Sequence, residues 1–211
     1  MRGAVSEHKY GRFHFRGGHP ALDFINTASE RNRERLTERL GSYDDLVSWA
    51  EQAGVVDGGR AAQLHALAAA RPRAAAAALR RARGLREASF RLFESLIEGR
   101  APVAADLALL NRRASRASGG GEVRWQGDGF RLALPPAAAP LDEPLEQVAR
   151  GIVEVLTGEQ SHHVSRCQNF ECSWLFLDRS PARGRRWCSM ADCGNRAKAR
   201  RHYERHRKQG A

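Results

Sequence analysis

Lysine is almost absent from this sequence. Only three of its 35 basic residues are lysine, and arginine supplies the rest. Because alanine is abundant as well, a GC-rich coding sequence accounts for part of the arginine excess, and the arginine count alone is weak evidence of function. The formal net charge is nevertheless +11, which favours a polyanionic partner. The positions of the arginines are therefore more informative than their number.

Long apolar runs are missing as well. No stretch approaches the ~18 apolar residues of a membrane-spanning helix, and the polar start from Met1 to Tyr10 lacks the apolar segment of a signal peptide. The first 166 residues contain no cysteine, which is not how disulfide-stapled secreted proteins distribute it. We therefore expect a soluble protein of the reducing cytoplasm, without membrane contact.

Local motifs of common enzyme classes are also missing. The sequence contains no G-x-S-x-G, no P-loop and no G-x-G-x-x-G, and it lacks the H-x-E and P-C-x-x-C pattern of zinc deaminases. We expect no enzymatic activity. An enzyme would need an enclosed pocket with perturbed acids in the N-terminal part of the chain.

The chain contains a series of helical patterns with a few short alternating segments. Pro72 separates two expected helices, and a Gly-Asp-Gly turn divides two alternating runs into a hairpin. In chain order, we expect a strand at 13–15, a helix at 20–27, a solvated connection at 30–39, a helix at 42–54, two helices within 59–98, a short helix at 103–113, a hairpin at 122–134, a linker at 135–140 and a helix at 145–157.

All four cysteines lie near the C-terminus in two C-x4-C pairs, Cys167 with Cys172 and Cys188 with Cys193. Two short turns that each donate two thiolates can surround one zinc ion tetrahedrally. Four thiolates leave no open coordination position, so the spacing predicts one structural zinc ion and not a catalytic one. Two disulfides are the alternative, which the cytoplasmic setting disfavours.

The segment between the cysteine pairs contains two short apolar runs, residues 174–177 and 185–187, which we expect to form a hairpin. A helix should then start at about Asp192 to Asn195 and continue to Arg207. The expected fold is mainly α with small β elements (α+β). Residues 1–160 would form a mostly helical domain, and residues 161–211 a small treble-clef or ribbon-like zinc finger.

The C-terminal motif also carries a family resemblance. The tetrad Cys193-Gly194-Asn195-Arg196, with the upstream Cys167 to Ser180 segment, resembles the CGNR zinc-finger family. Residues Pro20 to Thr27 resemble the opening motif of the ABATE domain, which precedes this finger in family members. The resemblance implies a stress-associated bacterial transcription regulator that binds DNA through the finger.

The basic residues concentrate on the finger. Between Arg183 and Lys208 there are ten basic residues against two acidic ones. A helix this basic can lie against phosphates, although a solvated tail is the alternative. The candidate nucleic-acid-binding residues are Arg185, Arg186, Arg196, Lys198, Arg200, Arg201, Arg205, Arg207 and Lys208. Arg196 could instead brace the zinc site, and we expect Asn195 to brace it. We expect Trp174 and Trp187 to pack the small core and not to stack on bases.

A second set of polar residues surrounds the first helix. His19, Asp23 and Asn26 could line a pocket for a small-molecule effector, or they could be local caps of that helix. The leading hypothesis is a DNA-binding transcription regulator whose N-terminal domain senses a ligand or mediates homodimerisation. The alternative is an RNA-binding or protein-interaction zinc module that acts indirectly.

Overall fold

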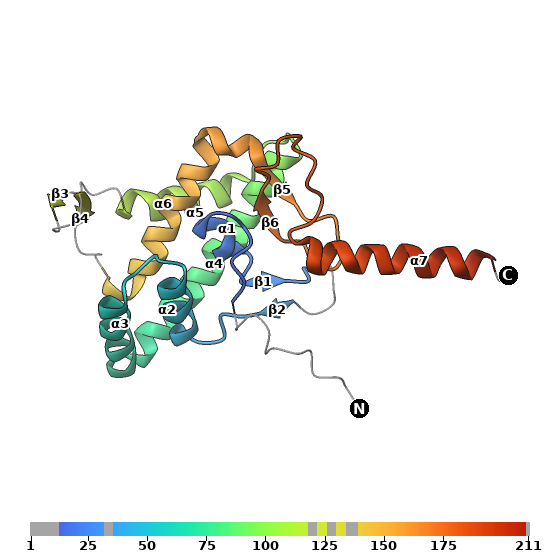
Figure 1. Cartoon of the computed structure of the whole chain (residues 1–211). Coiled ribbons are helices and arrows are strands. Elements are labelled where there is room, and N and C mark those ends of the chain that lie inside the picture. Colours follow the sequence, from blue (N-terminus) through green and yellow to red (C-terminus); the bar gives the residue numbers. More distant parts are fainter. Residues whose placement is uncertain (1–12, 32–35, 118–121, 126–129, 134–138, 210–211) are drawn as a thin grey trace, which may run out of the picture. The chain divides into compact units, whose positions relative to one another are not determined.

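The computed structural model describes residues 13–31, 36–117, 122–125, 130–133 and 139–209 (Figure 1). Its contacts divide the chain into two units. We call Met1–Arg39 with His162–Ala211 the finger unit, and Leu40–Ser161 the helical unit. The division into domains 1–160 and 161–211 stays a prediction. In the structure, the first segment of the chain groups with the finger.

The helical unit begins with three helices whose ends follow local sequence signals. Helix α2 (Tyr43–Gln52) starts in a capping box, in which the Ser42 side chain accepts the Asp45 N–H at 3.1 Å and the Asp45 carboxylate accepts the Ser42 N–H at 2.7 Å. Helix α3 (Gly58–Ala70) is capped by Asp57, and α4 (Pro72–Ile97) begins with proline at its first turn. These three helices confirm the expected ranges closely.

The rest of the helical unit contains further helices and a β-hairpin. Helix α5 spans Ala104–Ala117, the short 3-10 helix η2 spans Pro140–Asp142, and α6 spans Glu143–Thr157. The carboxylate of Asp142 is 3% exposed and accepts hydrogen bonds from Arg81 at 3.0 Å and Arg113 at 3.3 Å. The predicted hairpin also forms, with β3 (Glu122–Trp125) antiparallel to β4 (Phe130–Ala133), and its turn lies outside the described residues.

The first part of the finger unit differs from the sequence prediction at two places. Residues 13–16 form no strand; Phe13 is buried and Phe15 is exposed, whereas a strand would place both rings on the same face. Helix α1 spans Pro20–Ile25 as expected. The stretch predicted as a solvated connection instead ends in a ladder between β1 (Ala28–Ser29) and β2 (Thr37–Glu38), because buried β1 needs a partner for its backbone groups.

The predicted hairpin between the cysteine pairs is wrong. After the 3-10 helix η3 (Glu159–His163), strand β5 (Val164–Arg166) pairs antiparallel with β6 (Leu175–Leu177), so the first cysteine pair occupies the turn of the hairpin. The N–H of Cys167 continues this ladder to the Trp174 carbonyl at 2.8 Å. Residues 185–187 form no strand, because the Asp178 carboxylate accepts the N–H of Arg185 at 2.9 Å and turns the chain after β6.

The end of the chain is helical as predicted. A short π-helical turn, η4 (Met190–Gly194), leads directly into α7 (Asn195–Gln209), drawn in red in Figure 1. The fold class, mainly α with small β elements and a C-terminal four-cysteine finger, is confirmed. Among the residues that the structure describes, no helix combines the length and apolar character needed to cross a bilayer.

Candidate metal centre and nucleic-acid interface

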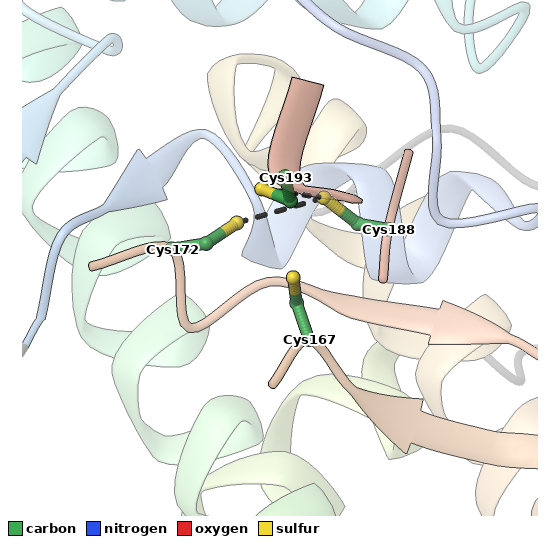
Figure 2. Close-up of side chains that lie close together, drawn as sticks. All are labelled: Cys167, Cys172, Cys188 and Cys193. Atoms are coloured by element: carbon green, nitrogen blue, oxygen red, sulfur yellow. Dashed lines mark hydrogen bonds between the residues drawn. The ribbon is translucent and has the colours of Figure 1, made fainter. Parts of the chain in front are cut away.

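The four cysteine sulfurs converge on one point, although they come from three different parts of the finger unit (Figure 2). Cys167 and Cys172 bound the β5–β6 turn, Cys188 lies in the following loop, and Cys193 lies in η4. All four side chains are buried, and their sulfurs lie within 4.8 Å of one another. The cysteines are free thiols, so the alternative of two disulfides does not hold.

The sulfur spacing fits tetrahedral zinc. The Sγ atom of Cys188 lies 3.6 Å from those of Cys172 and Cys193. A Zn–S bond of about 2.3 Å in a tetrahedron places neighbouring sulfurs about 3.8 Å apart. The two turns that hold the sulfurs are fixed by backbone bonds, since Cys172 N–H donates to Asn169 O and Gly194 N–H donates to Ser189 O.

Without a cation, the four sulfurs compete for protons. Hydrogen bonds with Cys172 and Cys188 lower the pKa of Cys167 to about 7, and the bond with Cys167 lowers the pKa of Cys193. The same contacts with Cys167 raise the pKa values of Cys172 and Cys188, because adjacent thiolates repel each other. A divalent ion removes this conflict, since it stabilises four thiolates together.

Polar groups around the sulfurs would balance the negative charge of a zinc–thiolate centre. Arg196 donates to the Cys193 sulfur at 3.4 Å. Burial alone would lower the pKa of the Arg196 guanidinium, but the adjacent Cys193 raises it. The side-chain N–H2 group of Asn169 is buried, and its interaction with the Cys193 sulfur is one of the causes that lower the pKa of Cys193. Asn195, the other brace considered, donates instead to the Ala191 carbonyl at 3.0 Å.

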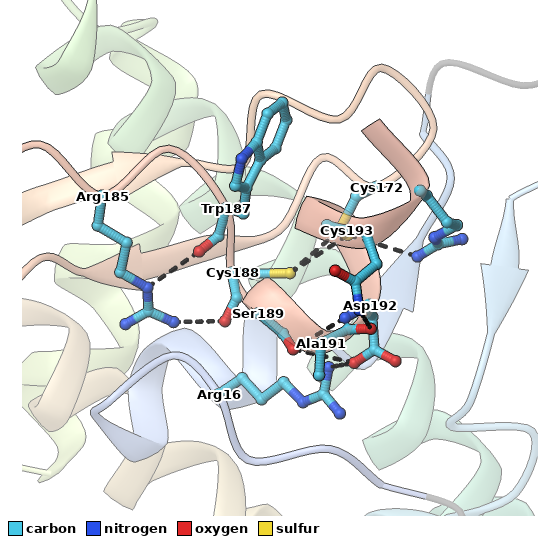
Figure 3. Close-up of polar contacts among 11 residues, drawn as sticks. Arg16, Cys172, Arg185, Trp187, Cys188, Ser189, Ala191, Asp192 and Cys193 are labelled. Atoms are coloured by element: carbon cyan, nitrogen blue, oxygen red, sulfur yellow. Dashed lines mark hydrogen bonds and ion pairs between the residues drawn. The ribbon is translucent and has the colours of Figure 1, made fainter. Parts of the chain in front are cut away.

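Arg185 and Asp192 shape the loop that carries the second cysteine pair (Figure 3). The Arg185 guanidinium donates to the carbonyls of Trp187 and Cys188 and lies 4.4 Å from the centre of the Phe176 ring. Asp192 forms an ion pair with Arg16 from the first segment of the chain. Burial alone would raise the pKa of Asp192, but the bonds from Arg16 and Ser189 hold it below its ordinary value.

The first segment of the chain completes the edge of β6. The side chain of Asn26 donates to the Leu175 carbonyl at 2.8 Å and accepts the Leu175 N–H at 2.9 Å, so one side chain satisfies both backbone groups. Two residues further along β6, the Leu177 N–H donates to the Gly17 carbonyl at 2.8 Å. A Cβ at Gly17 would lie 2.7 Å from that of Leu22, so this close approach requires glycine.

The structure places the three candidate effector residues in different roles. His19 caps α1 by accepting the Ala21 N–H at 3.1 Å, Asp23 accepts the Gly17 N–H at 2.6 Å, and Asn26 binds β6. Burial raises the pKa of Asp23 to about 6, although backbone hydrogen bonds from Gly17 and Arg16 oppose the shift. All three side chains therefore bind the protein's own backbone, and an effector pocket there stays a prediction.

The raised pKa of Asp23 predicts a pH-dependent stability. Because the folded carboxyl titrates near 6 and the unfolded one near 3.8, its stabilising contribution is full below pH 4 and is lost as the pH rises through 6. The side chain of Asp23→Asn cannot ionise. From pH 5 to pH 7.5, the free energy of unfolding of this variant should therefore increase by about 1 kcal/mol relative to that of the parent chain. Urea unfolding of both zinc-loaded chains at the two pH values measures this difference; parallel curves would contradict the assignment.

The basic residues of the finger fall into three groups. Arg185 is bound to backbone carbonyls as described. The residues that are exposed besides Arg185 are Arg186, Arg196, Lys198, Arg200 and Arg201. The backbones of Arg205, Arg207 and Lys208 lie within α7, and their side chains fall outside the described residues. Trp174 is buried and Trp187 packs against the same small core, as the sequence predicted.

Comparison with family models identifies both parts of the chain. The model of the ABATE family, described as "Putative stress-induced transcription regulator", matches residues 18–159. The chain belongs to the ABATE family. A second model, the CGNR zinc finger, matches residues 163–206, so the ABATE segment is followed by the finger as the resemblance implied. No curated protein matches the chain.

The finger match and the sulfur geometry together identify the ion. The four cysteines of this ABATE protein hold one structural zinc ion. The first family model describes a regulator and the second a zinc finger, and neither describes an enzyme. The ABATE match also contains α1, Asp23 and Asn26, which belong to the finger unit. The interactions of Asn26 and Gly17 with β6 and of Arg16 with Asp192 had no local signal in the sequence.

Proposed function

We propose that this ABATE protein is a bacterial transcription regulator that binds duplex DNA by laying helix α7 against the phosphate backbone. The observation that carries this proposal is the exposed basic surface at the start of α7, where Lys198, Arg200 and Arg201 are all exposed. We call these three residues the α7 cations. The proposal places the protein in the cytoplasm, where bacterial DNA lies.

The zinc site anchors this basic surface to the finger, which distinguishes it from a solvated tail. Cys193 lies in η4, directly before α7, so the bound ion fixes the start of the helix to the finger. The cations one to two turns later are then presented by an anchored helix, which loses less conformational entropy on binding than a disordered segment. Neutralising several phosphates supplies affinity that decreases with salt concentration.

The contribution of the N-terminal domain is the second part of the proposal: it senses a ligand or mediates dimerisation. The description of the ABATE family as a stress-induced transcription regulator supports either role. An RNA-binding or protein-interaction module remains the alternative function, and the DNA experiment below separates the two.

Replacing the α7 cations tests the phosphate contact. In Lys198→Ala/Arg200→Ala/Arg201→Ala, we expect at least tenfold weaker binding to a random duplex near 100 mM salt. The slope of log affinity against log salt should fall by about 3, since each lost phosphate contact releases about one counterion fewer. Fluorescence anisotropy of a labelled duplex, with zinc-loaded full-length chain across a salt series, gives both quantities.

The matched control removes the same charge from the helical unit. Arg73, Arg80 and Arg112 are exposed, so their triple alanine variant carries the same net charge as the first one. We expect its duplex affinity to stay within about twofold of the parent chain. Equal losses of duplex affinity in both triple variants would show that binding depends only on the net charge of the whole chain. An absence of duplex binding at low salt would reject the proposal in favour of the alternative.

A further inference from the structure

A pocket lies between the start of α7 and the turn from Cys167 to Cys172, which we call the knuckle. Its volume is about 480 Å³, within the range of sites that hold small molecules. One wall comes from the knuckle, with Gln168, Asn169, Phe170 and Glu171, and the other comes from α7 and the loop before the second cysteine pair. Both walls adjoin zinc ligands in the sequence, since Gln168 follows Cys167 and Trp187 precedes Cys188.

The pocket contains an aromatic surface that faces solvent. Phe170 is 65% exposed and lies within the knuckle, between the zinc ligands Cys167 and Cys172. Trp187, next to the ligand Cys188, adds a second ring to the lining and is partly buried. An exposed phenylalanine on a metal-anchored turn contributes little to the core, and a flat π surface suits a stacking partner.

Arginines surround these rings. The lining contains Arg186, Arg196, Arg200 and Arg201 against one acid, Glu171. Arg186 is held in place, because it donates to the Gln168 side chain at 2.6 Å and its guanidinium lies 5.4 Å from the centre of the Trp187 ring. Arg196 contacts the Cys193 sulfur, while Arg186, Arg200 and Arg201 add positive charge to the lining that a ligand's negative charge would meet.

We propose that this pocket takes one unpaired nucleotide of DNA, with its base against Phe170 and its phosphate at the arginines. Stacking rings beside phosphate-binding arginines are the chemistry that recognises unpaired bases, whereas bases within a duplex are stacked on each other and cannot enter. Gln168 lines the same pocket, and its side-chain amide belongs to the class of groups that hydrogen-bond base edges. This inference rests on the proposed DNA binding and specifies a second kind of contact for the same surface.

Phe170→Ala tests the inference on the zinc-loaded full chain. We expect binding to single-stranded oligo(dT) to weaken about tenfold, the loss expected when one base loses its aromatic partner. Binding to a blunt duplex should change less than twofold. Phe170→Tyr keeps the ring and should restore the affinity. Tyr203→Ala is the control, because Tyr203 is also an exposed aromatic residue but lies on α7 outside the pocket lining. Both of its affinities should stay within twofold of those of the parent chain.

The outcomes separate this inference from the proposed function. Unchanged oligo(dT) binding by Phe170→Ala, with duplex binding intact, overturns the pocket assignment alone. Loss of duplex binding in Phe170→Ala at full zinc content also overturns it, since the ring would then serve the duplex. Equal or tighter binding of oligo(rU) overturns the assignment to DNA. Oligo(dT) binding that depends on Phe170 without any duplex binding supports the pocket and rejects the duplex proposal.

Discussion

Removing zinc from the full-length chain is expected to unfold the finger unit and leave the helical unit folded. The small finger core consists of the four ligands themselves with Trp174, Phe176 and the partly buried Trp187. Structural zinc contributes about 10–16 kcal/mol in small fingers, which is more than such a core supplies without metal. Hydrogen exchange measured by mass spectrometry should show lost protection across 162–206 after chelation, unchanged protection across α2 to α4, and recovery on adding zinc.

Two substitutions separate metal loss from effects of the chelator. Cys193→Ser should reproduce the exchange pattern of the metal-free chain, whereas His162→Ala, within the finger unit but outside the sulfur cluster, should retain one zinc ion. Full protection of β5 and β6 in metal-free protein would show that the finger folds without the ion, and the structural role would then be rejected.

Replacing Asn26 by alanine is expected to loosen the zinc site, although Asn26 acts through Leu175, 149 residues away along the sequence. The substitution removes both partners of the buried Leu175 backbone groups, each worth about 1–3 kcal/mol when left unsatisfied. A total loss of about 3 kcal/mol corresponds to roughly 100-fold faster zinc release through opening of the unit. The rate of zinc transfer to a metallochromic dye measures this effect.

Asn195→Ala is the matched control for that measurement. Asn195 belongs to the CGNR tetrad yet is exposed, and its side chain donates to the Ala191 carbonyl. We expect its zinc release rate to stay within a few-fold of the parent chain. If Asn26→Ala releases zinc no faster than Asn195→Ala, then the first segment does not support the finger.

The parts of the structure that depend on local rules could be predicted from the sequence. The capping box at Ser42, the break at Pro72 and the C-x4-C spacing each act over a few residues, so their consequences can be inferred without knowing the fold. The terminal helix follows from the second cysteine pair in the same way. These features determine the fold class and the identity of the zinc ligands.

Long-range pairings could not be predicted in this way. Residues 185–187 resemble a strand as closely as 164–166 do, and only the bond between Cys167 and Trp174 and the turn at Asp178 select the latter as the partner of β6. Arg16 and Asp192 are 176 residues apart, so no local pattern connects them. The same is true of the pocket at Phe170, which needs two segments to approach each other.

The order of segments in the finger unit has a consequence for synthesis on the ribosome. The residues that complete β6, Gly17 and Asn26, are translated before the whole helical unit, and β6 itself after it. At about 5–20 residues per second, the 122 residues of Leu40–Ser161 keep the early segment waiting for about ten seconds. During that interval buried residues such as Phe24 and Ile25 have no β6 to pack beside, so ribosome-bound chains stalled before Cys167 should be the form most prone to aggregate and to recruit chaperones.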